Sequence, residues 1–306
     1  MGHQYTINRT IQLSGIGLHT GKTINMVLRP AVAGTGIVFH RSEGTRVVSI
    51  EAISANVVDT RLATVLGKDG LSVSTVEHIL AAASALGIDN LHIDIDGPEV
   101  PVLDGSAAPF VHHFRTAGQR RLSQHRKFLQ IRKPLMVVDG DKWVRLVPSR
   151  FLRITCDIAF DHPCISAQSR TVKVTPDVFS SEIAPARTFG FLREVEYLKA
   201  NGLARGGSLE NAVVIGEKQI LNPEGLRYPD EFVRHKILDA LGDFSLAGFP
   251  IIGHIKANKP GHDMNHRMVE TLLASPECWK IVELPRYSEQ IQPLPAFSAE
   301  LALSRA

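Results

Sequence analysis

Residues 231–243 read EFVRHKILDALGD, and this stretch predicts a helix with two different faces. His235, Asp239 and Asp243 recur every four residues, which places them on one helical face. The apolar residues between them occupy the remaining arc and predict a buried contact. We expect the helix to cover 231–247 and its polar face to meet either water or a binding site.

The segments around this helix predict an α+β protein with two related domains. The first half contains strand candidates, a helix expected over 74–86, and a strand at 90–97. The second half repeats the order, with strand candidates, a short helix at 193–202, the long helix and a strand at 250–259. In both halves a histidine lies near the start of the main helix.

Composition excludes several classes of protein. The chain has 306 residues, of which 44% are hydrophobic and 21% charged, with a net charge of +3. These values predict a packed globular protein and imply no nucleic-acid partner. The N-terminal residues lack the apolar core of a signal peptide, and no run approaches the roughly 18 apolar residues of a membrane span. We therefore expect a cytosolic protein.

The segment 115–133 is strongly basic, with seven Lys or Arg residues and no acid. Such a shift in composition suggests a solvated linker. The alternative is a weak contact with an anionic group, at most a transient contact with a membrane surface.

Two histidines and an aspartate predict a metal site. His235 and Asp239, four residues apart on one helix, can bind one ion together, although an exposed ion pair worth a few tenths of a kcal/mol is the alternative. His78 taken alone predicts an ordinary buried histidine. Added to the pair, it completes a set typical of catalytic zinc with one open position. The three cysteines have no CxxC spacing, which disfavours a thiolate site.

Acid–base groups accompany these ligands. Glu77 precedes His78 and suits a general base, but Ser74 to Glu77 also matches a capping box, in which Glu77 would bond to the Ser74 amide. His262 follows Pro260-Gly261, which predicts a turn from which the imidazole leans over the site. Asp243 could then hold it protonated by charge pairing.

Several motifs in fixed order resemble one family from end to end, the zinc-dependent UDP-3-O-acyl-N-acetylglucosamine deacetylases of lipid A biosynthesis. The motifs are SGIGLHTGK (14–22), STVEHILAA (74–82), PVLDGSA (101–107), ARTFGF (186–191), GLARGGSLENAVV (202–214), LNPEGLRYPDEFVRHKILDALGD (221–243) and KPGHDMNH (259–266).

The resemblance implies a role for each of several residues. Zn²⁺ would be bound by His78, His235 and Asp239, a ligand set that Fe²⁺ can also occupy. Glu77 is implied as the base, His262 as the acid with Asp243 as its charge partner, Thr188 as an oxyanion donor, and Lys236 as a substrate contact. The implied substrate-binding residues also include Phe189, Leu18, Val195, Gly207, Ser208 and Val214.

The resemblance also implies an architecture and a reaction. Each domain would be a layered sandwich of sheet and helices, with the active site between the two domains. We place the first domain at 1–125 and expect it to contain a small β insert. The second domain is placed at 126–285, with an acyl-chain passage near 191–220. A loose tail is expected at 286–306. The implied reaction removes the N-acetyl group from a UDP-linked acylated amino sugar, releases acetate and commits the sugar to lipid A in a Gram-negative bacterium.

Two alternatives and one further expectation accompany this prediction. The enzyme could act on another N-acyl sugar, or the chain could be a nonenzymatic anion-binding protein that uses the basic segment and a structural metal. The cysteine spacing disfavours the second alternative, because structural zinc usually has four protein ligands. We expect a monomer.

Overall fold

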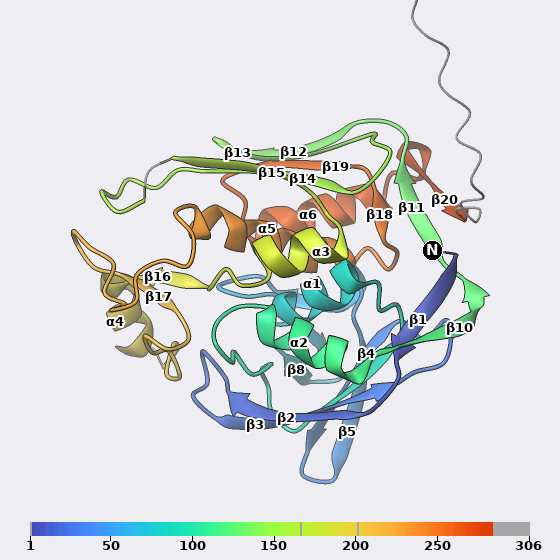
Figure 1. Cartoon of the computed structure of the whole chain (residues 1–306), viewed down its shortest axis with the longest axis horizontal. Coiled ribbons are helices and arrows are strands. Elements are labelled where there is room, and N and C mark those ends of the chain that lie inside the picture. The colour runs from blue at the N-terminus through green and yellow to red at the C-terminus, as the bar shows by residue number, and fades with distance from the viewer. Residues whose placement is uncertain (1, 166, 201, 284–306) are drawn as a thin grey trace, which may run out of the picture.

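Two five-stranded sheets frame the protein in the computed structural model, which describes residues 2–165, 167–200 and 202–283. The first sheet has the order β2 (Ile11–Ile16), β3 (Thr23–Pro30), β9 (Leu91–Ile95), β4 (Ile37–Glu43) and β5 (Arg46–Glu51). The second has the order β12 (Leu135–Asp139), β13 (Lys142–Val147), β19 (His254–Asn258), β14 (Arg153–Ile158) and β15 (Gln168–Lys173). The main helices lie between the sheets (Figure 1).

The two sheets have the same pairing pattern. In the first sheet the central strand β9 is antiparallel to β3 and parallel to β4. In the second the central strand β19 is antiparallel to β13 and parallel to β14. Each central strand follows a central helix in the chain. The α+β fold with two related halves is therefore confirmed, whereas the boundaries at 125/126 and 285/286 stay predictions, and the expected tail at 286–306 lies outside the described residues.

Helices α1 (Glu77–Leu86) and α5 (Glu231–Ser245) form the centre of the molecule and pack against each other. Their apolar faces are fully buried, as at Ile79 and Leu238, so burial of these faces stabilises the helices more than their intrinsic propensity does. Gly242 permits the close approach, because a Cβ there would overlap the carbonyl oxygen of Glu77. Helices α2 (Ala108–Ala117) and α6 (His262–Leu273) flank this pair.

Smaller elements complete the described part of the chain. β1 (His3–Ile7) pairs with β10 (Gln119–His125), and β11 (Lys127–Ile131) pairs with β18 (Ile251–Ile252) and β20 (Trp279–Glu283). The remaining strands are β6 (Val57–Asp59), β7 (Val65–Lys68), β8 (Leu71–Val73), β16 (Phe189–Phe191) and β17 (Val213–Ile215), and the remaining helices are η1 (Ser54–Asn56), α3 (Pro176–Val178), η2 (Phe179–Ile183), α4 (Leu192–Ala200) and η3 (Pro276–Cys278).

Several local predictions were wrong. The segment 115–133, predicted to be a solvated linker, mostly forms the strands β10 and β11, although most side chains of β10 are exposed to solvent as expected. The helix expected over 74–86 begins at Glu77, after Val76, which has no side-chain cap. His262 is not on a turn but is the first residue of α6, after Gly261. The long helix ends at Ser245 rather than 247.

Within the described residues, no helix is both long and apolar enough to cross a membrane. The cytosolic location stays a prediction.

Candidate active site

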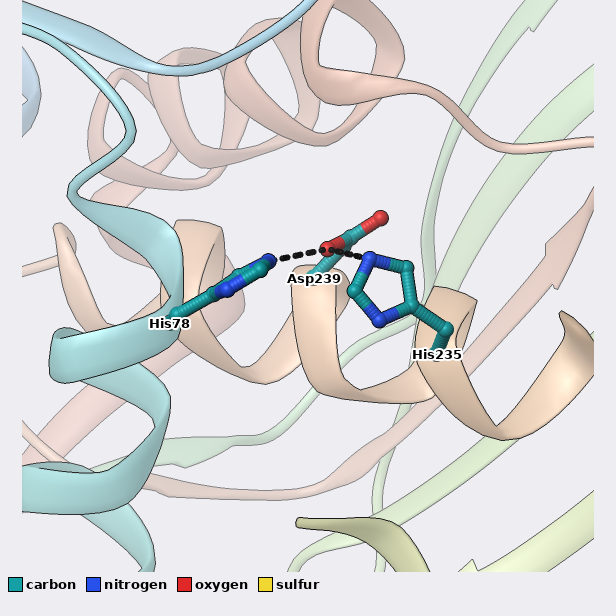
Figure 2. A group of neighbouring side chains, drawn as sticks. All are labelled: His78, His235 and Asp239. Carbon is teal, nitrogen blue, oxygen red and sulfur yellow. Dashed lines mark ion pairs between the residues drawn. The ribbon is translucent and has the colours of Figure 1, made fainter. Parts of the chain in front are cut away.

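The predicted metal ligands from α1 and α5 converge (Figure 2). Nε2 of His235 lies 3.3 Å from Oδ1 of Asp239, and Nε2 of His78 lies 3.8 Å from the same oxygen. The potential ligand atoms of these three buried residues all lie within 4.8 Å of one another. Two segments about 160 residues apart in the chain thus meet at a site able to bind one ion.

The hydrogen bonds of the site leave its ligand atoms available. Nδ1 of His235 lies 3.0 Å from the carbonyl oxygen of Ala186, which can only accept, so Nδ1 carries the hydrogen and the Nε2 lone pair is free. Oδ2 of Asp239 accepts from Nζ of Lys236 at 2.9 Å. Oδ1 is buried and has no hydrogen-bond partner among the described residues. A buried carboxylate oxygen without a donor fits a cation in its place.

The electrostatics favour the protonation states that bind metal. Burial, reinforced by the neighbouring His235, lowers the pKa of His78 to about 3, and burial also lowers the pKa of His235. Burial alone would raise the pKa of Asp239, but His235 and Lys236 outweigh it and the pKa is lowered. At neutral pH the group is therefore two neutral imidazoles and one carboxylate, the forms that ligate.

Glu77 lies beside the triad and is only 3% exposed. Its Oε2 accepts from the backbone N–H of Thr64 at 3.1 Å, and its Oε1 lies 3.7 Å from Nε2 of His262. The capping-box alternative is wrong, because the Ser74 amide donates to the carbonyl of Pro98 instead. Burial raises the pKa of Glu77 to about 7, against the opposing effect of His262. A carboxylate with a pKa near neutrality can accept a proton during a reaction.

His262 is held by a buried acid. Its Nδ1 lies 2.9 Å from Oδ2 of Asp243, which also accepts from Nδ2 of Asn265 at 2.8 Å. The other carboxylate oxygen of Asp243 accepts from the Thr64 hydroxyl at 2.6 Å. Burial would lower the pKa of His262, but Asp243 and Glu77 raise it to about 9. The imidazole is therefore protonated at neutral pH and presents Nε2–H toward Glu77.

These groups share a cavity of about 190 Å³. Nine of the predicted site residues line it, namely Leu18, Glu77, His78, Thr188, Phe189, His235, Lys236, Asp239 and His262. Asp243 is not part of the cavity lining and binds Nδ1 of His262. A larger cavity of about 350 Å³ lies near the C-terminal ends of α1 and α5, away from this chemistry.

Four predicted substrate-binding residues lie apart from this cavity lining. Val195 is on α4 beside Gly190, and Gly207 faces the Leu18 side chain. The Ser208 amide donates to Asn211 in a turn, and the Val214 amide in β17 donates to Asn222. Their predicted roles in substrate binding remain untested.

The structure also adds residues that the sequence did not reveal. Phe160, Leu62 and Glu194 line the cavity. Thr64 donates to the carboxylates of Glu77 and Asp243, and the Ala186 carbonyl accepts from His235. Thr64 lies immediately before β7, outside any helix or strand, and Ala186 acts through its backbone carbonyl. Neither position has a side-chain pattern that would have marked it.

Comparisons with known proteins agree with this geometry. The family model described as UDP-3-O-acyl N-acetylglycosamine deacetylase matches residues 4–274. The UDP-3-O-acyl-N-acetylglucosamine deacetylase of Syntrophotalea carbinolica is 66% identical over 283 residues, 92% of each chain. The enzyme of that name from Geotalea uraniireducens is 53% identical over 302 residues, 99% of this chain and 98% of the relative. The one from Myxococcus xanthus is 54% identical over 284 residues, 93% and 90% of the two chains. The chain therefore belongs to the family of UDP-3-O-acyl-N-acetylglucosamine deacetylases.

Proposed function

We propose that this enzyme removes the N-acetyl group from UDP-3-O-acyl-N-acetylglucosamine with zinc as its resident ion. Acetate and a free 2-amino group are the products. The observation that carries the proposal is Oδ1 of Asp239, a buried atom without a hydrogen-bond donor among the described residues. It lies within 3.8 Å of two Nε2 atoms, in a cavity that Glu77 and His262 also line.

His78, His235 and Asp239 would hold the ion. Two imidazole nitrogens and one carboxylate are a donor set that zinc accepts with a position left open, and Fe²⁺ is the alternative ion. A divalent cation supplies Lewis acidity, which polarises a carbonyl and makes water more acidic. Everything else in the reaction falls to the protein's own groups.

Glu77 is the proposed general base. Its carboxylate is buried, is oriented by the Thr64 amide and has a pKa near 7, so it can take a proton from the attacking water at neutral pH. The low polarity that raises this pKa also strengthens its interaction with the proton it accepts.

His262 is the proposed general acid. An amine leaves an amide carbon only after it gains a proton, and the His262 imidazolium, paired with Asp243, supplies one. Because Nε2 of His262 lies 3.7 Å from Oε1 of Glu77, acid and base approach the same reacting centre.

Thr188 is the proposed hydrogen-bond donor to the carbonyl oxygen of the acetamide, which becomes negative during the reaction. Lys236 is the proposed donor to the substrate. Both line the cavity. The Lys236 ammonium binds Asp239 and lies 5.7 Å from the Phe189 ring centroid, yet it has three hydrogens and can donate to a ligand as well.

The segment 191–220 is the proposed passage for the acyl chain. Its residues dock on the loop after β2, with the Gly206 amide donating to the Leu18 carbonyl at 3.0 Å. Apolar side chains are exposed at Ile16, the last residue of β2, and at Leu192, Leu203 and Leu209 in the segment 191–220. Each methylene that such a surface removes from water contributes about 0.8 kcal/mol to binding.

An acetate-release assay combined with metal analysis tests the proposal. We expect the purified protein to contain about one zinc or iron per chain and to release acetate from the UDP-linked acyl sugar. The same sugar without the acyl chain is the control and should be a much poorer substrate. Equal rates on both would favour the alternative of a different N-acyl sugar, and no release from either would contradict the proposed function.

A further inference from the structure

We propose that the buried ion pair between Arg187 and Glu231 positions the metal ligand His235, by fixing the backbone carbonyl that orients its imidazole. The inference rests on the proposed function, because it assigns these two residues to the metal site of that function. Neither residue lines the catalytic cavity, so both would act through their neighbours.

The pair is completely enclosed. Arg187 is 1% exposed and Glu231 is 0% exposed. Oε1 of Glu231 accepts from both the backbone N–H and Nε of Arg187, at 2.9 Å each, and its Oε2 lies 3.2 Å from Nη2. Glu231 therefore binds the main chain of Arg187 as well as its guanidinium. The Glu231 carboxylate, at the start of α5, therefore holds the backbone of the segment 186–188 in place.

The guanidinium is held at its other edge too. Nη1 of Arg187 donates to Glu224 at 2.5 Å, and Nη2 donates to the carbonyl of Gly225 at 2.7 Å. Oε2 of Glu231 further accepts from the Arg227 amide at 2.6 Å. Every nitrogen of the guanidinium thus has an acceptor, and a planar group held at both edges has one orientation.

The neighbours of Arg187 connect this pair to the active site. The Ala186 carbonyl, one residue earlier, accepts from Nδ1 of His235, and Thr188, one residue later, lines the catalytic cavity. The Thr188 amide donates to the Gly105 carbonyl at 2.8 Å, so the segment is also anchored to the first half. A shift of the Arg187 main chain would move both the Ala186 carbonyl and the Thr188 hydroxyl.

The spacing along α5 explains why this carboxylate suits the task. Glu231, His235 and Asp239 follow one another at intervals of four and share one face of the helix. Glu231 binds the segment 186–188 one turn before His235 does. Because both residues belong to one helix, the separation between Glu231 and His235 along the helix axis is fixed. Glu231 therefore holds the segment 186–188 at a constant height relative to His235, and this sets the distance between the Ala186 carbonyl and the His235 ring.

Stability alone does not account for the pair. Burying two charges carries a desolvation cost that their attraction offsets only in part, and apolar replacements of similar size are often as stable or more stable. The competing interpretation is that Arg187 and Glu231 merely close the core near the start of α5. The two interpretations differ in what happens to metal affinity when folding is preserved.

A double variant separates them. Arg187→Met with Glu231→Leu removes both charges together, so neither charge is left unpaired. The backbone N–H groups of Arg187 and Arg227 lose their acceptor, so we expect a folded protein that unfolds at a somewhat lower temperature than the parent. We expect its Zn²⁺ affinity, measured by competition with a chromophoric chelator, to fall about 10- to 100-fold, since partners that orient a metal-binding histidine contribute about that much. The visible absorption bands of bound Co²⁺ should also shift, because they report ligand geometry.

Matched variants keep the test decisive. Glu231→Gln keeps the shape and serves if the double variant does not fold, and we expect at least a tenfold loss of Zn²⁺ affinity. Asp230→Asn is the control: Asp230 precedes Glu231 and pairs with Arg170 at 2.8 Å and with Arg234, but has no hydrogen bond to 186–188 in the described structure. Its Zn²⁺ affinity should equal that of the parent.

Each result decides the question. A folded double variant, or a folded Glu231→Gln protein, that binds Zn²⁺ as tightly as the parent with unchanged Co²⁺ bands would overturn the inference. So would an equal loss of affinity in Asp230→Asn. If the parent itself bound no metal, the proposed function would fail instead, independently of these variants.

Discussion

The neighbours Glu77 and His78 show how strongly a residue's surroundings determine its chemistry. They share one helical turn and are equally buried, yet burial raises the pKa of the carboxyl to about 7 and lowers that of the imidazole to about 3. In both cases burial disfavours the charged form. The result is one residue able to exchange a proton near neutral pH and another that is neutral and so able to bind a metal ion.

Replacing Glu77 by Gln should separate catalysis from metal binding. The amide cannot accept a proton, so we expect kcat to fall by about 10²- to 10⁴-fold while the metal stays bound. Metal content after dialysis and acetate release are the two measurements. Asp239→Asn is the comparison and should lose metal. A Glu77→Gln protein that lost its metal as well would show that Glu77 is a ligand and not the base.

The pH dependence of kcat/KM should be bell-shaped. The rate requires Glu77 deprotonated, with a pKa near 7, and His262 protonated, with a pKa near 9, so it should rise toward neutrality and fall in alkaline solution. A bound cation stabilises the carboxylate and opposes the imidazolium, so both limbs shift to lower pH when metal is present. A profile without an alkaline limb would contradict the assignment of His262 as the acid.

The alkaline limb offers a sharper test through Asp243. The charged groups around His262 are Asp243, Glu77 and Asp239, all of which raise its pKa, and Asp243 has the largest effect. Asp243→Asn should therefore move the alkaline limb to lower pH. The acidic limb should move in the same direction by a smaller amount, because Asp243 also raises the pKa of Glu77. An unmoved alkaline limb would mean that another group titrates there.

Among the secondary-structure elements, those with a buried periodic face were predictable from the sequence. The alternation at Leu91, Ile93 and Ile95 predicted β9, and the apolar arc of residues 231–243 predicted α5. Both patterns follow directly from burial of one face.

Elements without such a face were missed or misjudged. β10 has mostly exposed side chains and pairs with β1, over 100 residues away, so its charges suggested a linker and nothing local indicated a partner. The polar residues at the start of α6 concealed its apolar stripe of Met264, Met268 and Leu272. The proposed metal ligands could be selected from residue type and spacing, whereas the hydrogen bonds made by Thr64 and Ala186 depend on tertiary structure.

The contact between α1 and α5 should be sensitive to a single methyl group. Ala is normally about 1 kcal/mol more favourable than Gly inside a helix. At Gly242 the added Cβ would overlap the Glu77 carbonyl oxygen and lie 2.8 Å from its carbonyl carbon and Cα, and backbone atoms cannot move aside alone. We therefore expect Gly242→Ala to destabilise the protein by about 1–3 kcal/mol in urea unfolding.

The same substitution should also weaken metal binding, since separating the helices moves His78 away from His235 and Asp239. Ser245→Ala, on the last turn of α5, is the control for a small change on the same helix and should affect Zn²⁺ affinity little. A Gly242→Ala protein as stable as the parent would show that the helices separate without cost.

For the molecule as a whole, a bound metal ion should stabilise the association of the two halves. One ligand comes from α1 in the first half and two from α5 in the second. Removing the ion with a chelator should lower Tm, and free zinc at about 100 times Kd should stabilise the fold by about 2.7 kcal/mol. Thermal unfolding at several zinc concentrations measures this. In His78→Ala the dependence should be much weaker, and an equally strong dependence there would place the ion elsewhere.

The division of the ligands between two distant segments also sets the order of events during biosynthesis. Of the proposed metal ligands and acid–base residues, the first half of the chain contains only Glu77 and His78, and one imidazole binds an ion more weakly than the complete set of three ligands. A chain that folds from its N-terminus therefore acquires its metal last, after α5 has emerged and docked on α1. The choice of ion would then be made by the folded site, in which all three proposed ligands are already in place, and not by a flexible polypeptide.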